Sequence, residues 1–424
     1  MASTPAPSWS PNLAHRMRYL LVFLAAYLVY GATALFVGRT TTPRVAYFDY
    51  LADSFAHARV DLPDPPGRHD LCEFEGRVYV VFPPLPALLL TPWAWIAGRA
   101  AINTVAFSIC LAALNIALAA AVIDGLRQLR WTAISRADAL WLLAAFAFGT
   151  AHWYAAIEGS AWFLGHICTL TFVMAAIIAA LWRHSLTLSL AFLAIAMLGR
   201  PHVILTAPLL LAIWRLRQLE RTGTVNGNHQ GGSALPFAIQ ILRTAWPLAL
   251  AGMLLAAYNQ IRFGNPLEFG YRYQNVETSL MGDLHGIGVF SVDYVMRNLK
   301  TMLISIPLWD STHHRIVPSD EGTSLLLTAP ALIWCLAARR PRDVVRAAWW
   351  SVALILIPLL TYYNAGWRQF GYRFSLDFLA PLLVLQALAL GPNGRWVFRS
   401  LVVLGLIINA WGVQWWFEAA RAFV

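Results

Sequence analysis

Two aspartates four residues apart, Asp49 and Asp53, follow the first long hydrophobic stretch of the chain almost at once. Residues at this spacing lie on one face of a helix, so the two carboxylates would point the same way at the surface of a membrane. Aromatic neighbours in residues 47–55 would bury the pair, which raises a carboxyl pKa and favours a general base. The alternative is that both are solvated loop acids or helix caps, and the sequence does not choose between the two as the base.

Arg200 is an unexpected cation, because it lies at a Gly-Arg-Pro break in a long apolar stretch. A charge there needs a partner or an aqueous pocket. A phosphate would satisfy it, since a guanidinium matches phosphate oxygens with two parallel hydrogen bonds. The alternative is a side chain that reaches the outer interface. Arg368 and Arg373, in an aromatic-rich loop near the end of the chain, are predicted to face the same compartment as Asp49.

Further side chains that could bind a substrate lie in or beside the predicted outside segments. They are His57, Arg59, Tyr79, Glu158, His166, Tyr258, Arg262, Tyr271, Trp367 and Tyr372. Each has a plain structural alternative. For Arg59 it is a salt bridge, for Glu158 and His166 it is anchoring at the interface, and for the others it is an aromatic belt with its usual cations.

The composition excludes a soluble protein. Hydrophobic residues make up 59% and charged residues 12% of the 424-residue chain, and the mean hydropathy is +0.58. A soluble domain carries about twice that charged fraction. The formal charge of +10 would fit nucleic-acid binding, but the arginines cluster in short loops between hydrophobic segments, as cytoplasmic loops do. We therefore expect an all-α polytopic membrane protein that binds no nucleic acid.

Eleven predicted spans place these arginines on one side of the membrane. They run at about 17–37, 101–124, 138–157, 163–182, 185–199, 202–216, 245–262, 322–338, 347–363, 374–391 and 396–416. Residues 1–16 are then a cytoplasmic tail, residues 17–424 form a single transmembrane domain, and the C-terminus lies outside. The two short spans in 185–216 could instead form one kinked pair inside the bundle.

Two long segments lie outside in this plan, residues 38–100 and 263–321. Within the first, Leu85–Gly98 is apolar but too short for a span, which predicts an interfacial or re-entrant helix. Gly76 between two short extended runs predicts a hairpin, and the prolines that follow would end its second strand. Residues 222–234 are polar and glycine-rich, which predicts a cytoplasmic linker.

Four local patterns resemble those of the GT-C glycosyltransferases, in the branch of lipid-carrier-dependent enzymes akin to protein mannosyltransferases and aminoarabinose transferases. They are Phe48-Asp49 with Asp53, Tyr79 to Pro86, Tyr258-Asn259 with Arg262-Phe263-Gly264 and Gly270-Tyr271, and Gly366-Trp367 with Phe370-Gly371-Tyr372-Arg373-Phe374. The patterns run through the whole chain. The resemblance implies a GT-C-like bundle of about eleven transmembrane helices, with interfacial helices in the first extracytoplasmic loop.

The resemblance also implies an activity and its partners. The chain would be an inverting glycosyltransferase of the inner (plasma) membrane, mannosyltransferase-like, that acts on the extracytoplasmic face in the crevice between residues 44–84 and the bundle. Its partners would be the bilayer, a polyprenyl-phosphate-linked sugar donor and a glycan, lipid or protein acceptor of the cell envelope.

The implied mechanism assigns roles to the residues above. Asp49 would take the proton from the acceptor hydroxyl. Arg200 or Arg373, assisted by Arg368 or His166, would stabilise the charge on the departing phosphate. No cofactor is expected to be required, although the aspartate pair at positions 49 and 53 could hold a divalent cation.

Three other functions stay open. A transporter or flippase of lipid-linked sugars would also need arginines, aromatics and many spans, but it should show paired halves and ionisable residues at mid-membrane depth. No repeat relates the halves of this sequence, and its acids are expected in the outside loops. A polymerase or ligase of lipid-linked glycans would suit the arginines and histidine of residues 263–321. A non-catalytic partner in an envelope assembly would not depend on Asp49.

Overall fold

The computed structural model describes residues 13–183, 185–222, 234–319, 321–366, 368–391 and 393–421. Within these ranges, five helices are long and apolar enough to cross a membrane. They are α1 (Leu13–Phe36), α4 (Thr104–Gln128), α7 (Ala161–Ile178, extended by a π-turn to Arg183), α15 (Arg342–Thr361) and α17 (Arg395–Arg421). The chain is therefore a helical, multi-pass membrane protein, as its hydropathy predicts.

Other predicted spans correspond to shorter or interrupted elements. Short helices are α5 (Arg136–Phe148), α6 (His152–Ala156), α8 (Leu186–Met197), α9 (Ala207–Thr222), α10 (Ala234–Thr244), α11 (Trp246–Phe263), α14 (Leu325–Thr328) and α16 (Leu379–Ala389). The predicted span 138–157 is broken at Gly149, between α5 and α6. Two others include 3-10 turns, Pro201–Thr206 before α9 and Pro330–Ala337 after α14, each opening with a proline. The total of eleven spans stays a prediction.

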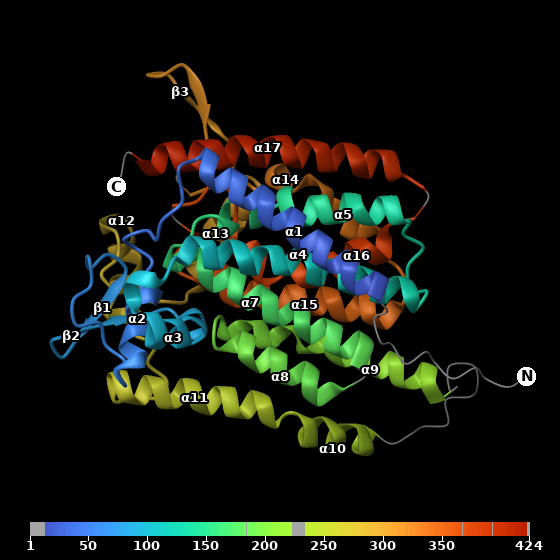
Figure 1. The fold of residues 1–424 in the computed structure, drawn as a ribbon, viewed down its shortest axis with the longest axis horizontal. Coiled ribbons are helices and arrows are strands. Elements are labelled where there is room, and N and C mark those ends of the chain that lie inside the picture. Colours follow the sequence, from blue (N-terminus) through green and yellow to red (C-terminus); the bar gives the residue numbers. More distant parts are fainter. Residues whose placement is uncertain are drawn as a thin grey trace, which may run out of the picture.

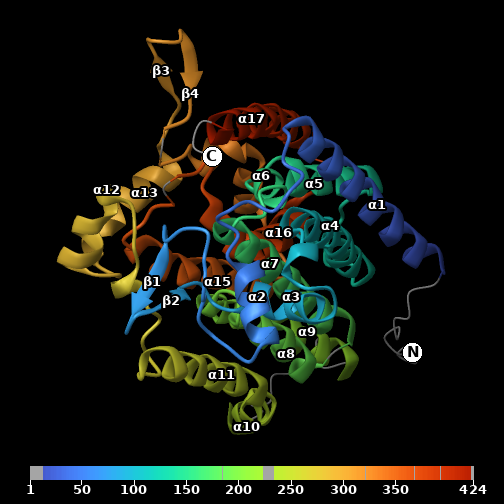
Figure 2. The ribbon, with the colours of Figure 1, turned by 60° about the vertical axis from the view of Figure 1, so that its left-hand side comes forward.

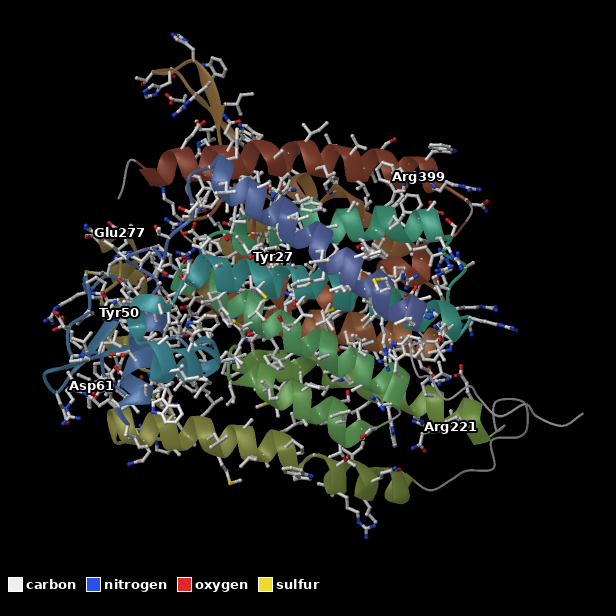
Figure 3. All side chains as sticks on the ribbon, in the orientation of Figure 1. Tyr27, Tyr50, Asp61, Arg221, Glu277 and Arg399 are labelled. Carbon is white, nitrogen blue, oxygen red and sulfur yellow. The ribbon has the colours of Figure 1, made fainter. Side chains whose placement is uncertain are left out.

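The helices run side by side between two different ends (Figure 1). At one end lie α2 (Phe48–Ala56), β1 (Leu71–Phe74), β2 (Arg77–Val80), α3 (Leu85–Ala97), α12 (Thr278–Met281) and α13 (Val295–Leu303). We call this the loop-rich end. Arg221 and Arg399 lie at the opposite, arginine-rich end, whereas Tyr50, Asp61 and Glu277 lie toward the loop-rich end (Figure 3). This separation of charge matches the pattern expected of the two sides of a membrane protein.

In residues 38–100, the first of the two segments predicted to lie outside, the predicted hairpin is confirmed. β1 and β2 form an antiparallel hairpin whose turn contains Gly76 at φ +73°. Two prolines then separate β2 from α3, which packs its apolar side chains against α2 in a shared buried cluster. The short helices α2 and α3 are thus fixed to each other and to the hairpin, which makes this loop a rigid support for the residues it carries.

The second long segment, residues 263–321, covers the same end. Its backbone pairs with the first segment, since Asp70 N–H donates to Asn275 O at 2.7 Å and Asn275 N–H donates to Leu71 O at 2.8 Å. Farther along, strands β3 (Leu308–Asp310) and β4 (Arg315–Val317) form a hairpin that projects sideways from the bundle (Figure 2). Residues 38–100 and 263–321 therefore form one layer over the ends of the helices.

The expectation that the acids lie in the outside loops is wrong for Asp377. This aspartate begins the predicted span 374–391 and is only 3% exposed within the bundle. Its burial is tolerated because two histidines and an arginine donate hydrogen bonds to its carboxylate. Two predicted segments lie mostly outside the described residues, the tail at 1–12 and the linker at 223–233.

Candidate active site

A cavity of about 240 Å³ opens at the loop-rich end of the bundle. It lies among the first turns of α7, the 3-10 turn after α8, the end of α15 and both outside segments. Its polar wall residues include Asp70, His166, Arg200, His202, Gln274 and Arg373. Aromatic rings fill most of the remaining wall, namely Phe48, Phe82, Trp162, Phe269, Tyr271, Phe290, Tyr362, Tyr363 and Phe374.

Asp377 organises the inner wall of the cavity. Its Oδ2 accepts hydrogen bonds from Arg200 Nε (3.1 Å) and Nη2 (2.9 Å) and from His202 Nε2 (2.9 Å). Its Oδ1 pairs with His166 Nδ1 at 2.8 Å. These residues are far apart in sequence, and only the fold joins them. The carboxylate fixes the direction of the arginine and both rings, while Arg200 and His202 keep about a fifth of their side-chain surface exposed.

The break in the helix at Gly199 brings Arg200 to this position. A Cβ at Gly199 would collide with Thr169 Oγ1 on α7, so glycine permits the close approach of the two segments. Pro201 then starts a 3-10 turn and prevents α8 from continuing. Arg200 therefore emerges at a helix break beside α7, with Asp377 as the partner that its charge requires.

Arg373 is a second cation of the cavity wall and is 5% exposed. Its Nη1 donates to the carbonyl oxygens of Gly366 (2.6 Å) and Arg368 (3.2 Å). The guanidinium carbon lies 5.4 Å and 5.2 Å from the ring centres of Phe163 and Phe374. These contacts hold the charge at the cavity, and in the part of the chain that the structure describes none of them is to a carboxylate, so an anionic group of a ligand could bind there.

Asp70 is the acid that lines the cavity. Its Oδ2 accepts a hydrogen bond from Trp162 Nε1 at 2.8 Å, and its Oδ1 accepts one from Gln274 Nε2 at 3.1 Å. Gln274 is in turn held by the Tyr363 hydroxyl at 3.3 Å. Burial raises the pKa of Asp70, while His69 and the two donors oppose that shift. A carboxylate with an elevated pKa and a fixed direction can act as a general base.

The two predicted acids of α2 lie elsewhere. Asp49 is 4% exposed and pairs with Arg99 at 3.6 Å, outside the cavity wall. Burial raises the pKa of Asp49 although Arg99 is near. Asp53 is half-exposed and accompanies the exposed His57, whose Nδ1 lies 2.8 Å from the Asp53 carbonyl oxygen. Asp49 is buried and Asp53 is half-exposed, so the two carboxylates of this helix lie in different environments.

Three further predicted binding residues make structural contacts. Arg59 pairs with Asp61 through two hydrogen bonds on the surface. Glu158 is buried, with Oε1 bound by Arg39 Nη2 at 2.9 Å and Oε2 by Trp416 Nε1 at 3.3 Å. Arg262 donates to Val80 O and Asn259 Oδ1, both at 2.7 Å, and so joins α11 to the β1–β2 hairpin.

The predicted aromatics divide in the same way. Tyr271 lines the cavity and meets Tyr362 edge to face, with ring centres 6.0 Å apart. Tyr79 and Tyr258 pack around the α11–hairpin junction, and Tyr372 is buried against Phe374. Arg368 contributes its carbonyl oxygen to Arg373. Trp367 lies outside the described residues.

Among the described residues, no group of three or more histidine, cysteine, aspartate or glutamate side chains is arranged to hold a metal ion. The site also contains residues that we did not single out from the sequence, namely Asp70, Trp162, His202, Gln274 and Asp377. A signal existed for Asp377, because an ionisable residue inside an apolar span marks a functional site by default. Nothing local marks Gln274.

The chain matches no family model and no curated protein. Among solved structures, it is similar to the archaeal oligosaccharyltransferase AglB from Archaeoglobus fulgidus, determined in complex with an inhibitory peptide and a dolichol-phosphate. The identity is 11% and the TM-score is 0.43, over 97% of this chain and 56% of that one. This chain therefore spans about half the length of that protein, and the likeness is too slight to bear on its function.

Proposed function

We propose that this protein is an integral-membrane glycosyltransferase that moves a sugar from a polyprenyl-phosphate carrier to an acceptor hydroxyl on the extracytoplasmic face. One observation carries the proposal. A single cavity at the loop-rich end combines a partly buried carboxylate, Asp70, with the guanidinium groups of Arg200 and Arg373. Inverting sugar transfer needs a base for the attacking hydroxyl and positive charge for the leaving phosphate, with room for a sugar between them.

The residues fit the steps of such a reaction. Asp70 accepts the proton of the acceptor hydroxyl as that oxygen forms a bond to the anomeric carbon. The bond from this carbon to the phosphate oxygen breaks with its electron pair, and Arg200, Arg373 and His202 stabilise the resulting phosphate charge. The bilayer holds the carrier's tail and so brings the phosphate to the inner wall.

The size of the cavity supports a small transferred group. At about 240 Å³, it lies below the roughly 300–1,000 Å³ of sites for drug-sized ligands. It suits a single sugar better than a whole oligosaccharide. The identity of that sugar, the mannosyl preference and the acceptor remain predictions from the resemblance.

Sugar transfer in reconstituted membranes tests the proposal. Labelled undecaprenyl-phosphate sugars would be offered to wild type, Asp70→Asn, Asp49→Asn and Asp53→Asn. We expect transfer by wild type and a loss of about 10²–10⁴-fold in Asp70→Asn, the usual contribution of a general base. Asp53→Asn is the matched control, since this half-exposed aspartate lies outside the cavity wall.

The other results have distinct meanings. Loss of transfer in Asp49→Asn with full activity in Asp70→Asn would identify Asp49 as the base, as the sequence resemblance implies. If wild type transferred sugar from none of the donors, the proposal that the protein is a glycosyltransferase would be contradicted, and a transporter of lipid-linked sugars would be favoured.

A further inference from the structure

His166 has one ring nitrogen bound and the other free. The residue is 1% exposed, and its Nδ1 bonds to the Asp377 carboxylate at 2.8 Å. Its Nε2 is buried and has no hydrogen-bond partner among the residues that the structure describes. A buried polar atom without a partner is rare and costs about 1–3 kcal/mol. Since His166 lines the cavity, a ligand is the natural partner for this nitrogen.

The partner of Nδ1 decides the chemical character of Nε2. An ionised carboxylate only accepts hydrogen bonds, so Nδ1 carries the proton that is shared with Asp377. A second proton on Nε2 would be a buried donor with no acceptor, next to a carboxylate already bound by Arg200 and His202. Nε2 therefore carries a lone pair, on a residue that lines the cavity. A lone pair accepts a hydrogen bond from a hydroxyl and repels a phosphate oxygen.

The position of His166 suits the sugar rather than the acceptor or the carrier. It lies one helical turn along α7 from Trp162, which binds Asp70. Arg200 is bound to the same Asp377 as His166. Gly165 also lines the cavity, and a Cβ added there would meet no atom within 4 Å, so the cavity is open at that position. Through Trp162 and Asp377, His166 is thus close to the residues that hold both the proposed base and the proposed phosphate site.

We infer that His166 Nε2 accepts a hydrogen bond from a hydroxyl of the transferred sugar and so selects donors that carry a hydroxyl at that position. The inference rests on the proposed function and differs from the phosphate-binding role predicted from the sequence. A site built to bind a hydroxyl leaves its own polar group unpaired when a deoxy sugar enters, and it rejects that sugar for this reason.

Acylation by diethyl pyrocarbonate tests the geometry without any assay of activity, because this reagent attacks only an unprotonated ring nitrogen and must reach the buried His166 through the cavity that this residue lines. The protein in nanodiscs would be treated at neutral pH and mapped by peptide mass spectrometry. His152 is the internal control, since it is equally buried but shares its ring nitrogens with Tyr30 at 2.9 Å and Asn115 at 3.5 Å. We expect His166 to react at least about tenfold faster than His152, whose reaction requires local opening.

Protection then identifies the ligand. We expect undecaprenyl phosphate carrying mannose, glucose or aminoarabinose, whichever the site accepts, to protect His166, and undecaprenyl phosphate alone to leave it reactive. The inference would be overturned if bare undecaprenyl phosphate protected His166 as well as the sugar-carrying forms do, or if none of the four probes protected it. It would also be overturned if His166 reacted no faster than His152. If the sugar-carrying forms protected His166 but no sugar were transferred to any acceptor, the binding role of His166 would stand and the proposed glycosyltransferase activity would be refuted.

Two variants of His166 distinguish binding of a sugar hydroxyl by Nε2 from the structural hydrogen bond of Nδ1 to Asp377. His166→Asn keeps a donor near the Nδ1 position for Asp377 but removes Nε2, whereas His166→Gln places an amide near the Nε2 position. We expect His166→Asn to lose at least about fivefold in transfer, as for a lost hydrogen bond of about 1 kcal/mol, and to lose discrimination against the corresponding deoxy donor. Discrimination that survives in His166→Asn would show that this nitrogen reads no hydroxyl.

Discussion

Asp70 combines two opposing influences on one carboxylate. Burial favours its neutral form, while hydrogen bonds from Trp162 and Gln274 favour its charged form. A general base must be charged to act, so activity should appear above the pKa of Asp70 and disappear as the pH falls through it. Since burial prevails and raises this pKa, the loss should begin at a higher pH than for an exposed aspartate.

Replacing Trp162 with phenylalanine should move this acid limb to still higher pH. The change removes one donor that stabilises the charged carboxylate and keeps an aromatic ring in the wall. The measurement is kcat/KM for sugar transfer across the acidic range. Trp153→Phe is the control, because Trp153 donates to the neutral Thr33 hydroxyl instead. An acid limb that stays in place in Trp162→Phe would show that Asp70 is not the titrating base.

The same burial predicts that Asp70→Asn, whose amide keeps one acceptor oxygen for either Trp162 or Gln274, folds with a stability near that of wild type at neutral pH. A folded-state pKa above the unfolded value means that the fold prefers the neutral carboxyl, so stability falls as the pH rises through that window. Asparagine is neutral throughout and avoids this loss. The thermal midpoint in nanodiscs measures it, and a large drop in Asp70→Asn would contradict it.

We expect Asp61→Asn, in contrast, to lower the stability of the fold near neutral pH. Its partner Arg59 holds the pKa of Asp61 below the ordinary value, so the charged form stabilises the fold above the unfolded pKa, and that stabilisation is lost as the pH falls. Arg59 is half-exposed, so we expect a loss of no more than about 1 kcal/mol.

Among the elements, the β1–β2 hairpin carries Asp70 immediately before its first strand, and Arg262 of α11 holds the hairpin in place. Its two hydrogen bonds reach Val80 O and Asn259 Oδ1, and its guanidinium carbon lies 3.9 Å from the Tyr258 ring centre. Arg262→Met leaves both acceptors short of a donor, so we expect a loss of about 2–4 kcal/mol in stability and weaker transfer. Arg59→Met is the surface control; an equal effect of both changes would refute this role.

The end of α15 has a similar support in α13. Asn298 is fully buried, and its Nδ2 donates to the carbonyl oxygens of Leu360 (2.9 Å) and Tyr362 (2.7 Å), just where the helix ends beside the cavity. Asn298→Ala should cost about 1–3 kcal/mol and raise KM for the donor by loosening Tyr362. Lys300→Ala, an exposed truncation on the same helix, should change the thermal midpoint little. Equal thermal midpoints for Asn298→Ala and Lys300→Ala would show that Asn298 does not stabilise the end of α15.

The sequence predicts which helices and strands form more readily than it predicts which of their side chains meet. The long apolar runs and their arginine-rich ends predict α1, α4, α7, α15 and α17, and the glycine at position 76 predicts the hairpin. These depend on local pattern. The cavity depends instead on pairs such as His166–Asp377 and Trp162–Asp70, which are 211 and 92 residues apart. No single-sequence pattern encodes such pairs, so Asp49, conspicuous by its neighbours, stood out ahead of Asp70.

For the whole molecule, the separation of charge between the two ends predicts an orientation. Cytoplasmic ends of membrane proteins carry the excess of arginine, so the arginine-rich end should face the cytoplasm and the loop-rich end, with the cavity, should face outside (Figure 3). The donor's phosphate would then be read on the outer side, where the proposed transfer takes place.

Single cysteines and a membrane-impermeant maleimide test this orientation in whole cells. Lys300 is exposed on α13 at the loop-rich end, and Arg221 is exposed at the opposite end. In a background without the four native cysteines, we expect Lys300→Cys to be labelled in intact cells and Arg221→Cys only after permeabilisation. The reverse result would place the cavity on the cytoplasmic side, and a transferase acting outside the membrane would no longer be tenable. Because the labelling of each variant is compared before and after permeabilisation of the same cells, unequal expression of the two variants cannot imitate either outcome.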